Sequence, residues 1–326
     1  MIITRTPFRV SFAGGGSDLE AFWREEPGAV LSTAIDKYLY LTVKRRFGGT
    51  FRVSYSRTEI TDRADQIEHP IVRECLKRLG VEKGLEVVSV ADLPAQSGMG
   101  SSSSFTVGLL HALHAHGGRM MSAKALAEAA CEIEIDTLRE PIGKQDQFIA
   151  AHGGLQFIQF HPDGHVSVDP VICPPHTRRE LAARLVLFFT GMTRNARDVL
   201  AKQQANTPDQ RPALRQLCRI ARDMRDVLSG GENLNEFGRL LHAAWEVKKS
   251  VEGSISTAAI DGWYERGRAA GARGGKLLGA GGGGFLLFYC EPHLQPQLCE
   301  ALAELERVPF APEPEGSKVI FVGGDL

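Results

Sequence analysis

Residues 93–105 constrain this chain more than any other segment. They read Leu-Pro-Ala-Gln-Ser-Gly-Met-Gly-Ser-Ser-Ser-Ser-Phe and lead into apolar residues at helical spacing, Phe105, Leu109 and Leu113. Glycine lets the backbone approach a bulky anion, and a helix start offers unpaired N–H groups at the positive end of its dipole. Serine hydroxyls can donate to phosphate oxygens or ligate magnesium. The segment therefore predicts a polyphosphate-binding loop, with a serine-capped turn as the structural alternative, and it is not a Walker loop because no lysine follows the glycines.

Composition narrows the remaining classes of function. The chain has 326 residues, of which 43% are hydrophobic, and a formal net charge of −1 at pH 7. This length predicts about two domains, and the balanced charge argues against nucleic acid as a partner. No apolar run approaches the ~20 residues that span a bilayer, so we expect no membrane partner. The six cysteines are scattered without a CxxC pair, which favours a reduced, cytoplasmic location.

The order of the expected elements predicts a two-domain α+β protein. Strand-like alternation dominates the first hundred residues, and helical patterns cover 70–80, 104–116 and 122–139. The proline-rich segment 171–176 marks the boundary that we expect between an N-terminal domain, 1–175, and a C-terminal domain, 176–326. After a strand at 185–190, the second part shows four helical patterns and a last strand, near 194–205, 212–229, 235–251, 256–271 and 319–322.

Two further glycine-rich turns carry possible binding groups. In Ala13–Asp18, Asp18 can accept hydrogen bonds from sugar hydroxyls, cap the next helix, or do both. Residues 279–284 fit GxGxxG formally, but a strand-like segment follows them where a dinucleotide fingerprint needs a helix. Such a run of glycines is expected where the backbone approaches a ligand or another loop, and a hairpin turn is the alternative.

Two carboxylates, Asp146 and Glu134, are candidates for a catalytic or metal-binding role. Asp146 lies between a glycine-bearing turn and an apolar segment, where it can orient an alcohol or cap a helix. Glu134 lies at the edge of the inward face of the expected 122–139 helix. A carboxylate aimed inward favours a cation, such as magnesium bound to nucleotide, and a surface ion pair is the alternative.

Taken together, these motifs resemble the GHMP kinase superfamily. The three family motifs occur in the expected order, at 7–18, 94–104 and 279–284, and the family's acidic motif matches 143–147. The resemblance covers essentially the whole chain. It implies the GHMP kinase fold, with an N-terminal domain similar to ribosomal protein S5 domain 2 and a ferredoxin-like C-terminal domain.

The resemblance also implies roles for individual residues, with ATP and Mg²⁺ as cofactors. The ATP phosphates would contact Pro94, Gly98, Met99, Gly100, Ser101, Ser102 and Ser103. Mg²⁺ would be held by Ser102 and Glu134. Catalysis would fall to Asp146 paired with Arg9, which leaves open whether Asp146 removes a proton or only stabilises charge. The sugar would contact Gly15, Gly16, Ser17, Asp18, Lys144, Arg194, Gly281 and Gly282. A substrate that already bears a phosphate needs cations to bind it, and Lys144, Arg194 and Arg197 are the candidates. The family layout places adenine near residues 55–68.

The expected substrate follows from similarity to particular sugar kinases within the superfamily. Residues 12–18 depart from the Gly-Glu-His-Thr-Asp of galactokinases and are similar to D-glycero-D-manno-heptose 7-phosphate kinases and bacterial fucokinase domains, as is Thr190–Arg194. Without an attached pyrophosphorylase domain, the heptose enzymes are favoured, which make the 1,7-bisphosphate for GDP-heptose and surface polysaccharide. We therefore expect a small-molecule sugar phosphate as partner. A kinase for another sugar, of the fucose or galactose type, and a non-catalytic sugar sensor are the alternatives. A homo-oligomer is left open.

Overall fold

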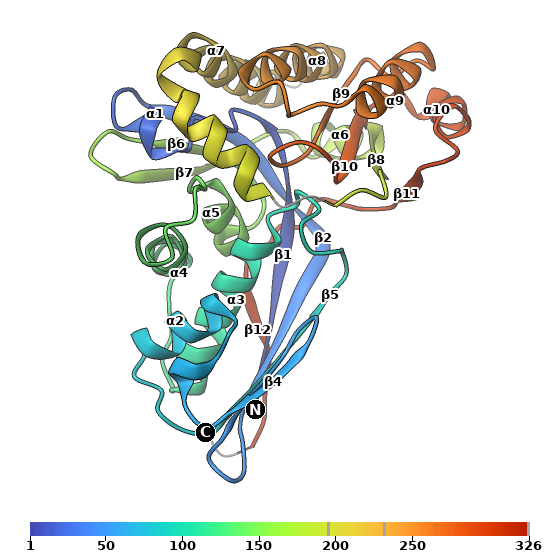
Figure 1. Cartoon of the computed structure of the whole chain (residues 1–326). Helices are drawn as coiled ribbons and strands as arrows, with labels where there is room; N and C mark the ends of the chain where they lie inside the picture. Colours follow the sequence, from blue (N-terminus) through green and yellow to red (C-terminus); the bar gives the residue numbers. More distant parts are fainter. Residues whose placement is uncertain (194–195, 231–232, 325–326) are drawn as a thin grey trace.

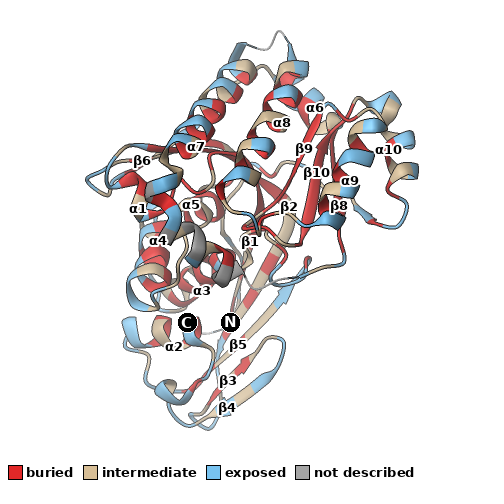
Figure 2. Ribbon diagram, turned by 45° about the horizontal axis from the view of Figure 1, so that its top comes forward, coloured by how far each residue is buried: buried red, intermediate tan, exposed pale blue. Residues whose placement is uncertain are grey.

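The molecule consists of two β-sheets, whose strand pairs are mostly antiparallel, and of the helices packed on them. The computed structural model describes residues 1–193, 196–230 and 233–324 (Figure 1). The larger sheet has eight strands and the smaller has four. Buried residues lie on the sheets and on the helices that cover them (Figure 2). The mixture of helices and sheets agrees with the expected α+β class.

The larger sheet runs in the order β12-β1-β2-β5-β3-β4, and β6 and β7 extend it from β2. Its strands are β1 (Ile2–Ala13), β2 (Gly28–Arg45), β3 (Phe51–Ser54), β4 (Thr58–Thr61), β5 (Leu85–Ala91), β6 (Leu155–Phe160), β7 (Val166–Pro170) and β12 (Lys318–Val322). The long strand β2 pairs with β6 through residues 28–33 and with β5 through residues 39–45. Strand β1 lies along both halves of β2 and so reaches from the end that carries both termini to the middle of the molecule (Figure 1).

Helices pack on one face of this sheet. They are α2 (Pro70–Arg78), α3 (Ser101–His116), α4 (Ala123–Cys131) and α5 (Gln145–His152). Helix α3 contacts β1, β2, α4 and α5, and residues 103–110 are all buried. Because a helix apolar on all sides is enclosed by its neighbours, the start of α3 is held in a fixed position.

The smaller sheet has the strand order β11-β8-β10-β9 and is antiparallel throughout. Its strands are β8 (Leu185–Phe189), β9 (Gly274–Leu277), β10 (Phe285–Tyr289) and β11 (Glu306–Val308). The associated helices are α6 (Pro175–Arg184), α7 (Ala196–Gly230), α8 (Leu234–Val251), α9 (Ala258–Ala269) and α10 (Gln295–Ala301). Helices follow the first and third strands of this sheet, which is the element order of a ferredoxin-like domain.

The structure differs from the sequence expectations in two places. The patterns near 194–205 and 212–229 form one helix, α7, which continues through Pro208 and Pro212. Each proline costs a helix about 3 kcal/mol, and the packing of α7 on α8 and β2 offsets this. The expected helix 122–139 changes at Glu132 into a π-helical segment, Glu132–Thr137.

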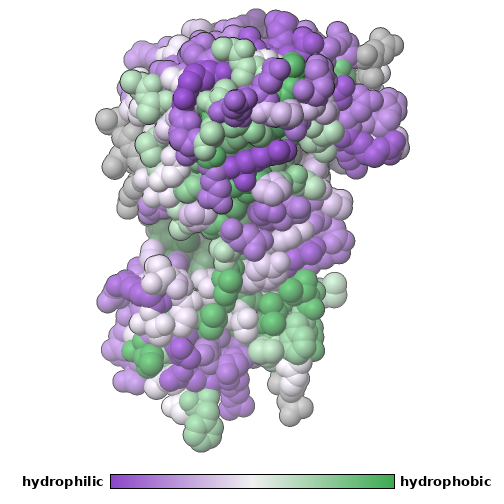
Figure 3. Space-filling view, turned by 90° about the vertical axis from the view of Figure 1, so that its right-hand side faces the viewer, coloured by the Kyte–Doolittle hydropathy of each residue, from purple (hydrophilic) through white to green (hydrophobic). Residues whose placement is uncertain are grey.

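The last strand, β12, pairs with β1 and so returns the chain to the larger sheet. The division at residue 175 stays a prediction. In the described part of the chain, no helix combines the length and the apolar character needed to cross a bilayer. Figure 3 shows a mainly hydrophilic upper part, with apolar side chains gathered toward the end where both termini lie. The exposed apolar side chains include Ile60, Val90, Ile320 and Val322.

Candidate active site

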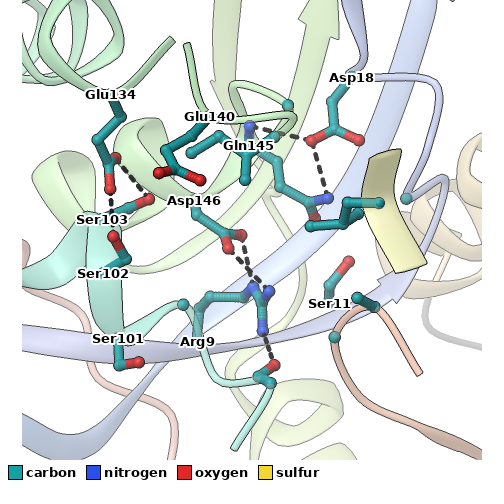
Figure 4. A pocket seen from close by; sticks show the side chains of 18 of the residues that line it. Arg9, Ser11, Asp18, Ser101, Ser102, Ser103, Glu134, Glu140, Gln145 and Asp146 are labelled. Atoms are coloured by element: carbon teal, nitrogen blue, oxygen red, sulfur yellow. Dashed lines mark hydrogen bonds and ion pairs between the residues drawn. The ribbon is translucent and has the colours of Figure 1, made fainter. Parts of the chain in front are cut away.

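A cavity of about 590 Å³ brings together residues that are far apart in the sequence. Its walls come from β1, the turn after it, the start of α3, the π-helical segment, the 140–146 loop, α7, α8, β9 and the loop after β9. Figure 4 shows the side chains of Arg9, Asp18, Glu134 and Asp146 around this space. The segments that the sequence singled out therefore do converge.

The predicted phosphate loop turns into α3 through two left-handed glycines. Gly98 and Gly100 both have φ of +78°, a conformation that other residues adopt at a cost. The first helical hydrogen bond runs from the Ser104 N–H to the Gly100 carbonyl, so the N–H groups of residues 101–103 precede the helical ladder. Gly98, Gly100, Ser101, Ser102 and Ser103 line the cavity. Their arrangement suits an anion at the positive end of α3.

Two members of the predicted phosphate set shape the loop from behind. Met99 is fully buried, and its carbonyl accepts a hydrogen bond from the Arg9 N–H. The carbonyl of Pro94 accepts the Ser97 hydroxyl at 2.7 Å. Neither Pro94 nor Met99 is among the residues that line the cavity. The structure thus gives them internal contacts that hold the loop.

Glu134 forms a hydrogen-bonded cluster with the start of α3. Its Oε1 accepts the Ser102 hydroxyl at 2.5 Å, and its Oε2 accepts the Ser103 hydroxyl at 2.9 Å and the Gln147 amide at 2.7 Å. The carboxylate is fully buried. Burial raises the pKa of Glu134, and the hydrogen bonds from Ser102, Ser103 and Gln147 oppose that shift. The sequence pattern placed Glu134 at an edge, whereas the π-helical segment carries it fully inside.

A cation would suit this cluster. The Ser102 hydroxyl and the Glu134 carboxylate are oxygen donors on the wall of the cavity, the ligand type that Mg²⁺ prefers. No group of three His, Cys, Asp or Glu residues able to hold a metal occurs in the described ranges. Mg²⁺ bound here would therefore take its other ligands from water and from the phosphates of a nucleotide.

Arg9 and Asp146 form a bidentate ion pair. Arg9 Nε donates to Asp146 Oδ1 at 2.8 Å, and Nη2 donates to Oδ2 at 3.0 Å. The remaining guanidinium nitrogen, Nη1, donates to the Gly98 carbonyl at 2.6 Å. The Arg9 side chain is only 6% exposed and that of Asp146 is 23% exposed. Arg9 therefore fixes the carboxylate of Asp146 beside the phosphate loop (Figure 4).

The first glycine turn holds Asp18 against the loop before α5. Asp18 Oδ1 accepts the Gly16 N–H at 2.8 Å, and Oδ2 accepts the Gln145 side-chain amide at 3.0 Å. Burial raises the pKa of Asp18. Leu19, not Asp18, stands at the N-cap of the short helix α1 (Glu20–Trp23), which has no side-chain cap. Asp18 therefore does not cap α1, and its role in binding sugar stays a prediction.

The other predicted sugar contacts divide into two groups. Gly15 and Gly16 line the cavity with Asp18. Ser17 is buried behind the turn, where its hydroxyl donates to the Gly14 carbonyl at 2.8 Å. Gly281 and Gly282 lie against Ile255, whose carbonyl accepts the Gly282 N–H at 2.9 Å.

The third glycine loop contacts the phosphate loop directly, which answers why it is so rich in glycine. A Cβ on Gly98 would lie 2.5 Å from the Leu278 carbonyl oxygen, and one on Gly279 would lie 2.5 Å from Gly98 Cα. The cavity-lining positions of this loop are Gly279 and Ala280. The backbone thus approaches another loop as closely as side-chain-free residues allow.

The predicted cationic residues are placed differently. Lys144 lines a second cavity of about 290 Å³. Its amino group lies 4.2 Å from the centre of the Trp23 ring and donates to the Gly164 carbonyl at 3.2 Å. Arg194 lies outside the described residues, and the side chain of Arg197 is not described either.

Two lysines that sequence reasoning missed line the main cavity instead. Lys276 Nζ donates to the Ser11 and Phe12 carbonyls at 2.8 and 3.1 Å, and Lys248 Nζ donates to the Gly15 carbonyl at 3.3 Å. Burial lowers the pKa of Lys276 to about 7 and that of Lys248 to about 8. A signal existed for Lys248, because it continues the apolar stripe of Leu241 and Ala244 on α8.

The opposite end of the cavity is aromatic and apolar. The His69 ring stacks on Phe105 with centroids 4.7 Å apart, and Tyr55 meets His69 edge-on at the same separation. Tyr55, His69 and Ile71 line the cavity. This end lies within or beside the 55–68 segment expected for adenine, and its flat apolar groups suit a heterocyclic base.

Two family profiles match the chain in sequence order. The GHMP kinases N terminal domain matches residues 67–154, and the GHMP kinases C terminal domain matches residues 224–306. The chain belongs to the GHMP kinases. This confirms the expected family and fold, and it makes the protein a phosphotransferase. GHMP kinases in general use ATP as phosphate donor, so the cavity of this GHMP kinase is its candidate active site.

Named relatives of this GHMP kinase include sugar kinases. It is 29% identical over 318 residues to the D-glycero-alpha-D-manno-heptose 7-phosphate kinase of Campylobacter jejuni subsp. jejuni serotype O:2, covering 92% of this chain and 93% of the relative. It is 27% identical to the bifunctional fucokinase/GDP-fucose pyrophosphorylase of Arabidopsis thaliana, covering 86% of this chain but only 29% of that protein. The crystal structure of a D-glycero-D-manno-heptose 1-phosphate kinase from Bacteroides thetaiotaomicron superposes with a TM-score of 0.82 at 24% identity, covering 99% of this chain and 100% of that one. That last likeness shows the shared fold.

Proposed function

We propose that this GHMP kinase transfers the γ-phosphoryl group of ATP to the anomeric hydroxyl of D-glycero-D-manno-heptose 7-phosphate, giving the 1,7-bisphosphate. The observation that carries the proposal is the Arg9–Asp146 pair, held by the Gly98 carbonyl beside the phosphate loop. Support for the sugar comes from the heptose 7-phosphate kinase relative at 29% identity. The similarity at 12–18 and 190–194 points the same way.

In this proposal the nucleotide lies along the start of α3. Its phosphates contact the N–H groups and hydroxyls of residues 101–103, and its base occupies the end of the cavity at Tyr55 and His69. The Ser102 hydroxyl and the Glu134 carboxylate hold Mg²⁺ there. Magnesium, when bound, supplies neutralisation of the charge that develops on the transferring phosphate.

The acceptor sugar lies between Asp146 and the first glycine turn. Asp146 accepts a hydrogen bond from the anomeric hydroxyl and orients its oxygen for in-line attack, while Arg9 keeps the carboxylate in one orientation. Asp18 is held by Gly16 and Gln145, and its carboxylate accepts from other sugar hydroxyls. Phosphoryl transfer depends mostly on positioning and electrostatics, which are what these fixed groups provide.

An ADP-release assay over heptose 7-phosphate, mannose, fucose and galactose tests the proposal. We expect the highest kcat/KM with heptose 7-phosphate and a product whose new phosphate resides on C1 by ³¹P NMR. A preference for fucose would instead give the chain the activity named for the Arabidopsis relative. Tight sugar binding without ADP release from any of the four would refute a kinase and leave a sugar sensor.

A further inference from the structure

We propose that Lys248, Lys276 and the Ser11 hydroxyl form the subsite that binds the phosphate group already carried by the acceptor sugar. The inference rests on the proposed function and names which residues select a phosphorylated substrate. It differs from the predicted set of Lys144, Arg194 and Arg197: Lys144 lines the second cavity, Arg194 lies outside the described residues, and the side chain of Arg197 is not described. All three members of the proposed subsite line the main cavity.

Lys276 is a buried cation at the boundary between the two sheets. It belongs to β9 of the smaller sheet, yet its amino group donates to the carbonyls of Ser11 and Phe12 on β1 of the larger sheet. The residue is 7% exposed. An ammonium group has three N–H donors, and its described contacts use two of them. The third remains for a ligand in the cavity.

Lys248 approaches the same region from α8. Its amino group donates to the Gly15 carbonyl in the first glycine turn, and the residue is 8% exposed. Lys248 and Lys276 are close enough for each charge to be felt by the other, which contributes to the lowered pKa of Lys276. Burying two cations near each other raises their free energy, and an anion bound beside them lowers it. A phosphate dianion is such an anion.

Unsatisfied polar atoms mark the space between these lysines and the catalytic pair. The Ser11 hydroxyl is buried, lines the cavity and has no hydrogen-bond partner among the described contacts. The Gln145 Oε1 oxygen is a second such atom. Buried hydroxyls without partners are uncommon in folded proteins, so an unpaired one on a cavity wall points to a ligand. Figure 4 shows Ser11 on the opposite side of Arg9 from Glu134 and Ser102.

The strand geometry sets the reach of the subsite. Arg9 and Ser11 are two residues apart on β1, so their side chains share a face and lie ~7 Å apart along the strand. Asp146 is fixed on Arg9, and the lysines cluster around Ser11 and Gly15. A sugar whose reacting hydroxyl meets Asp146 therefore extends its far end toward the lysines. A phosphate at that far end fits a heptose 7-phosphate better than an unmodified sugar.

The carboxylate of Asp18 also contributes to the charge around the lysines. Asp18 favours the charged form of Lys248. Its two oxygens already accept hydrogen bonds from Gly16 and Gln145, so its orientation is set by those groups. Asp146 is paired to Arg9. Lys248 and Lys276 both bring positive charge to this end of the cavity, where a phosphate group can bind.

The test compares phosphorylated with free sugars in the full-length enzyme. The values of kcat/KM are measured for heptose 7-phosphate against heptose, and for mannose 6-phosphate against mannose, in the wild type, Lys248→Met and Lys276→Met. Because charge-assisted hydrogen bonds are lost, we expect each variant to lose about 10- to 100-fold more on the phosphorylated sugar than on the free one. Lys249→Met is the matched control, since Lys249 is the next residue on α8 and pairs with Glu246 outside the cavity.

Each outcome decides the inference. Equal losses on both members of a sugar pair would assign the lysines a structural role and overturn it, as would a wild type that prefers free sugars. A wild type that turns over no sugar would refute the proposed function itself. If Lys276→Met fails to fold, Lys276→Arg retains the charge. The Arg variant is expected to keep the preference for phosphorylated sugars, and loss of that preference in Lys248→Met then carries the decision.

Discussion

Two substitutions of Glu134 can distinguish a structural role of this residue from a metal-binding role. Its carboxylate is fully buried and accepts three hydrogen bonds, from Ser102, Ser103 and Gln147. Glu134→Ala removes all three at once, which leaves the buried Ser103 hydroxyl and Gln147 amide without this acceptor, whereas Ser102 is exposed to solvent. Each buried donor left without an acceptor costs about 1–3 kcal/mol, so we expect a loss of about 2–6 kcal/mol of unfolding free energy. With an unfolding entropy of about 2.1 cal/mol/K per residue, that loss corresponds to roughly 3–9 °C in Tm for a chain of 326 residues.

Glu134→Gln retains the shape and most of the hydrogen bonds. Its amide oxygen can accept the serine hydroxyls, and its amide nitrogen needs an acceptor. Gln147 can supply one, because its Oε1 is buried without a described partner and an amide flip would present that oxygen. The substitution also removes a carboxyl group whose pKa is raised by burial. At a pH above 4.5, the pKa of this group in the unfolded chain, its ionisation therefore destabilises the fold. We expect the nucleotide-free variant to be as stable as the wild type or more stable.

Catalysis should respond in the opposite sense. If Glu134 holds Mg²⁺, Glu134→Gln lowers kcat by about 100- to 1000-fold, as expected when one group that stabilises transition-state charge is removed. The assay is thermal unfolding without nucleotide, followed by kcat over a range of Mg²⁺ concentrations. Wild-type kcat with an unchanged Mg²⁺ dependence in Glu134→Gln would refute the metal role. A wild-type Tm in Glu134→Ala would show that the hydrogen bonds to Glu134 do not stabilise the fold.

Three further outcomes follow from the geometry. Asp146→Asn is expected to lose about 100- to 10,000-fold in kcat with an unchanged fold by circular dichroism, and near-normal turnover would remove Asp146 from the mechanism. Gly143→Ala places a Cβ 2.0 Å from Asp18 Oδ2, so we expect a raised KM for the sugar with an unchanged KM for ATP; a uniform change in both would contradict the sugar-side placement. The pKa values of Lys276 and Lys248, about 7 and about 8, lie below their value of 10.5 in the unfolded chain. Between pH 7 and pH 10.5 the unfolded state therefore binds more protons than the folded state. The stability of the ligand-free protein is expected to rise as the pH increases through this range. Urea unfolding at pH 7 and 9 checks this, and Lys276→Met should show a smaller rise than the wild type.

Local signals were enough to predict the glycine turn at residues 98–100 and the helix that follows it. A glycine that needs positive φ and a serine-rich helix start are properties of a few neighbouring residues, and the structure has both at Gly98, Gly100 and α3. The same holds for the first glycine turn. The ordered set of such signals predicted the family, which the two matched profiles confirm.

Signals that depend on tertiary packing were not found in the sequence. The π-helical segment buries Glu134 more deeply than a regular helical period predicts, because one extra residue per turn shifts the face that it presents. The prolines in α7 favoured two helices, and packing on α8 and β2 overrides that local preference. Lys276 gave no signal at all, since the β1 carbonyls that hold it are more than 260 residues away.

The site is built as two groups of residues with different origins. Arg9 ties Asp146 and Gly98 together through three hydrogen bonds, so β1, the phosphate loop and the start of α5 form one fixed unit on the larger sheet. The lysines come from α8 and β9, on the side of the smaller sheet. Because Gly98 and Gly279 pack backbone against backbone, the two groups are held at one separation. In the proposed function, this contact sets the distance between Asp146 and the two lysines, and a side chain on Gly98 or Gly279 would change it.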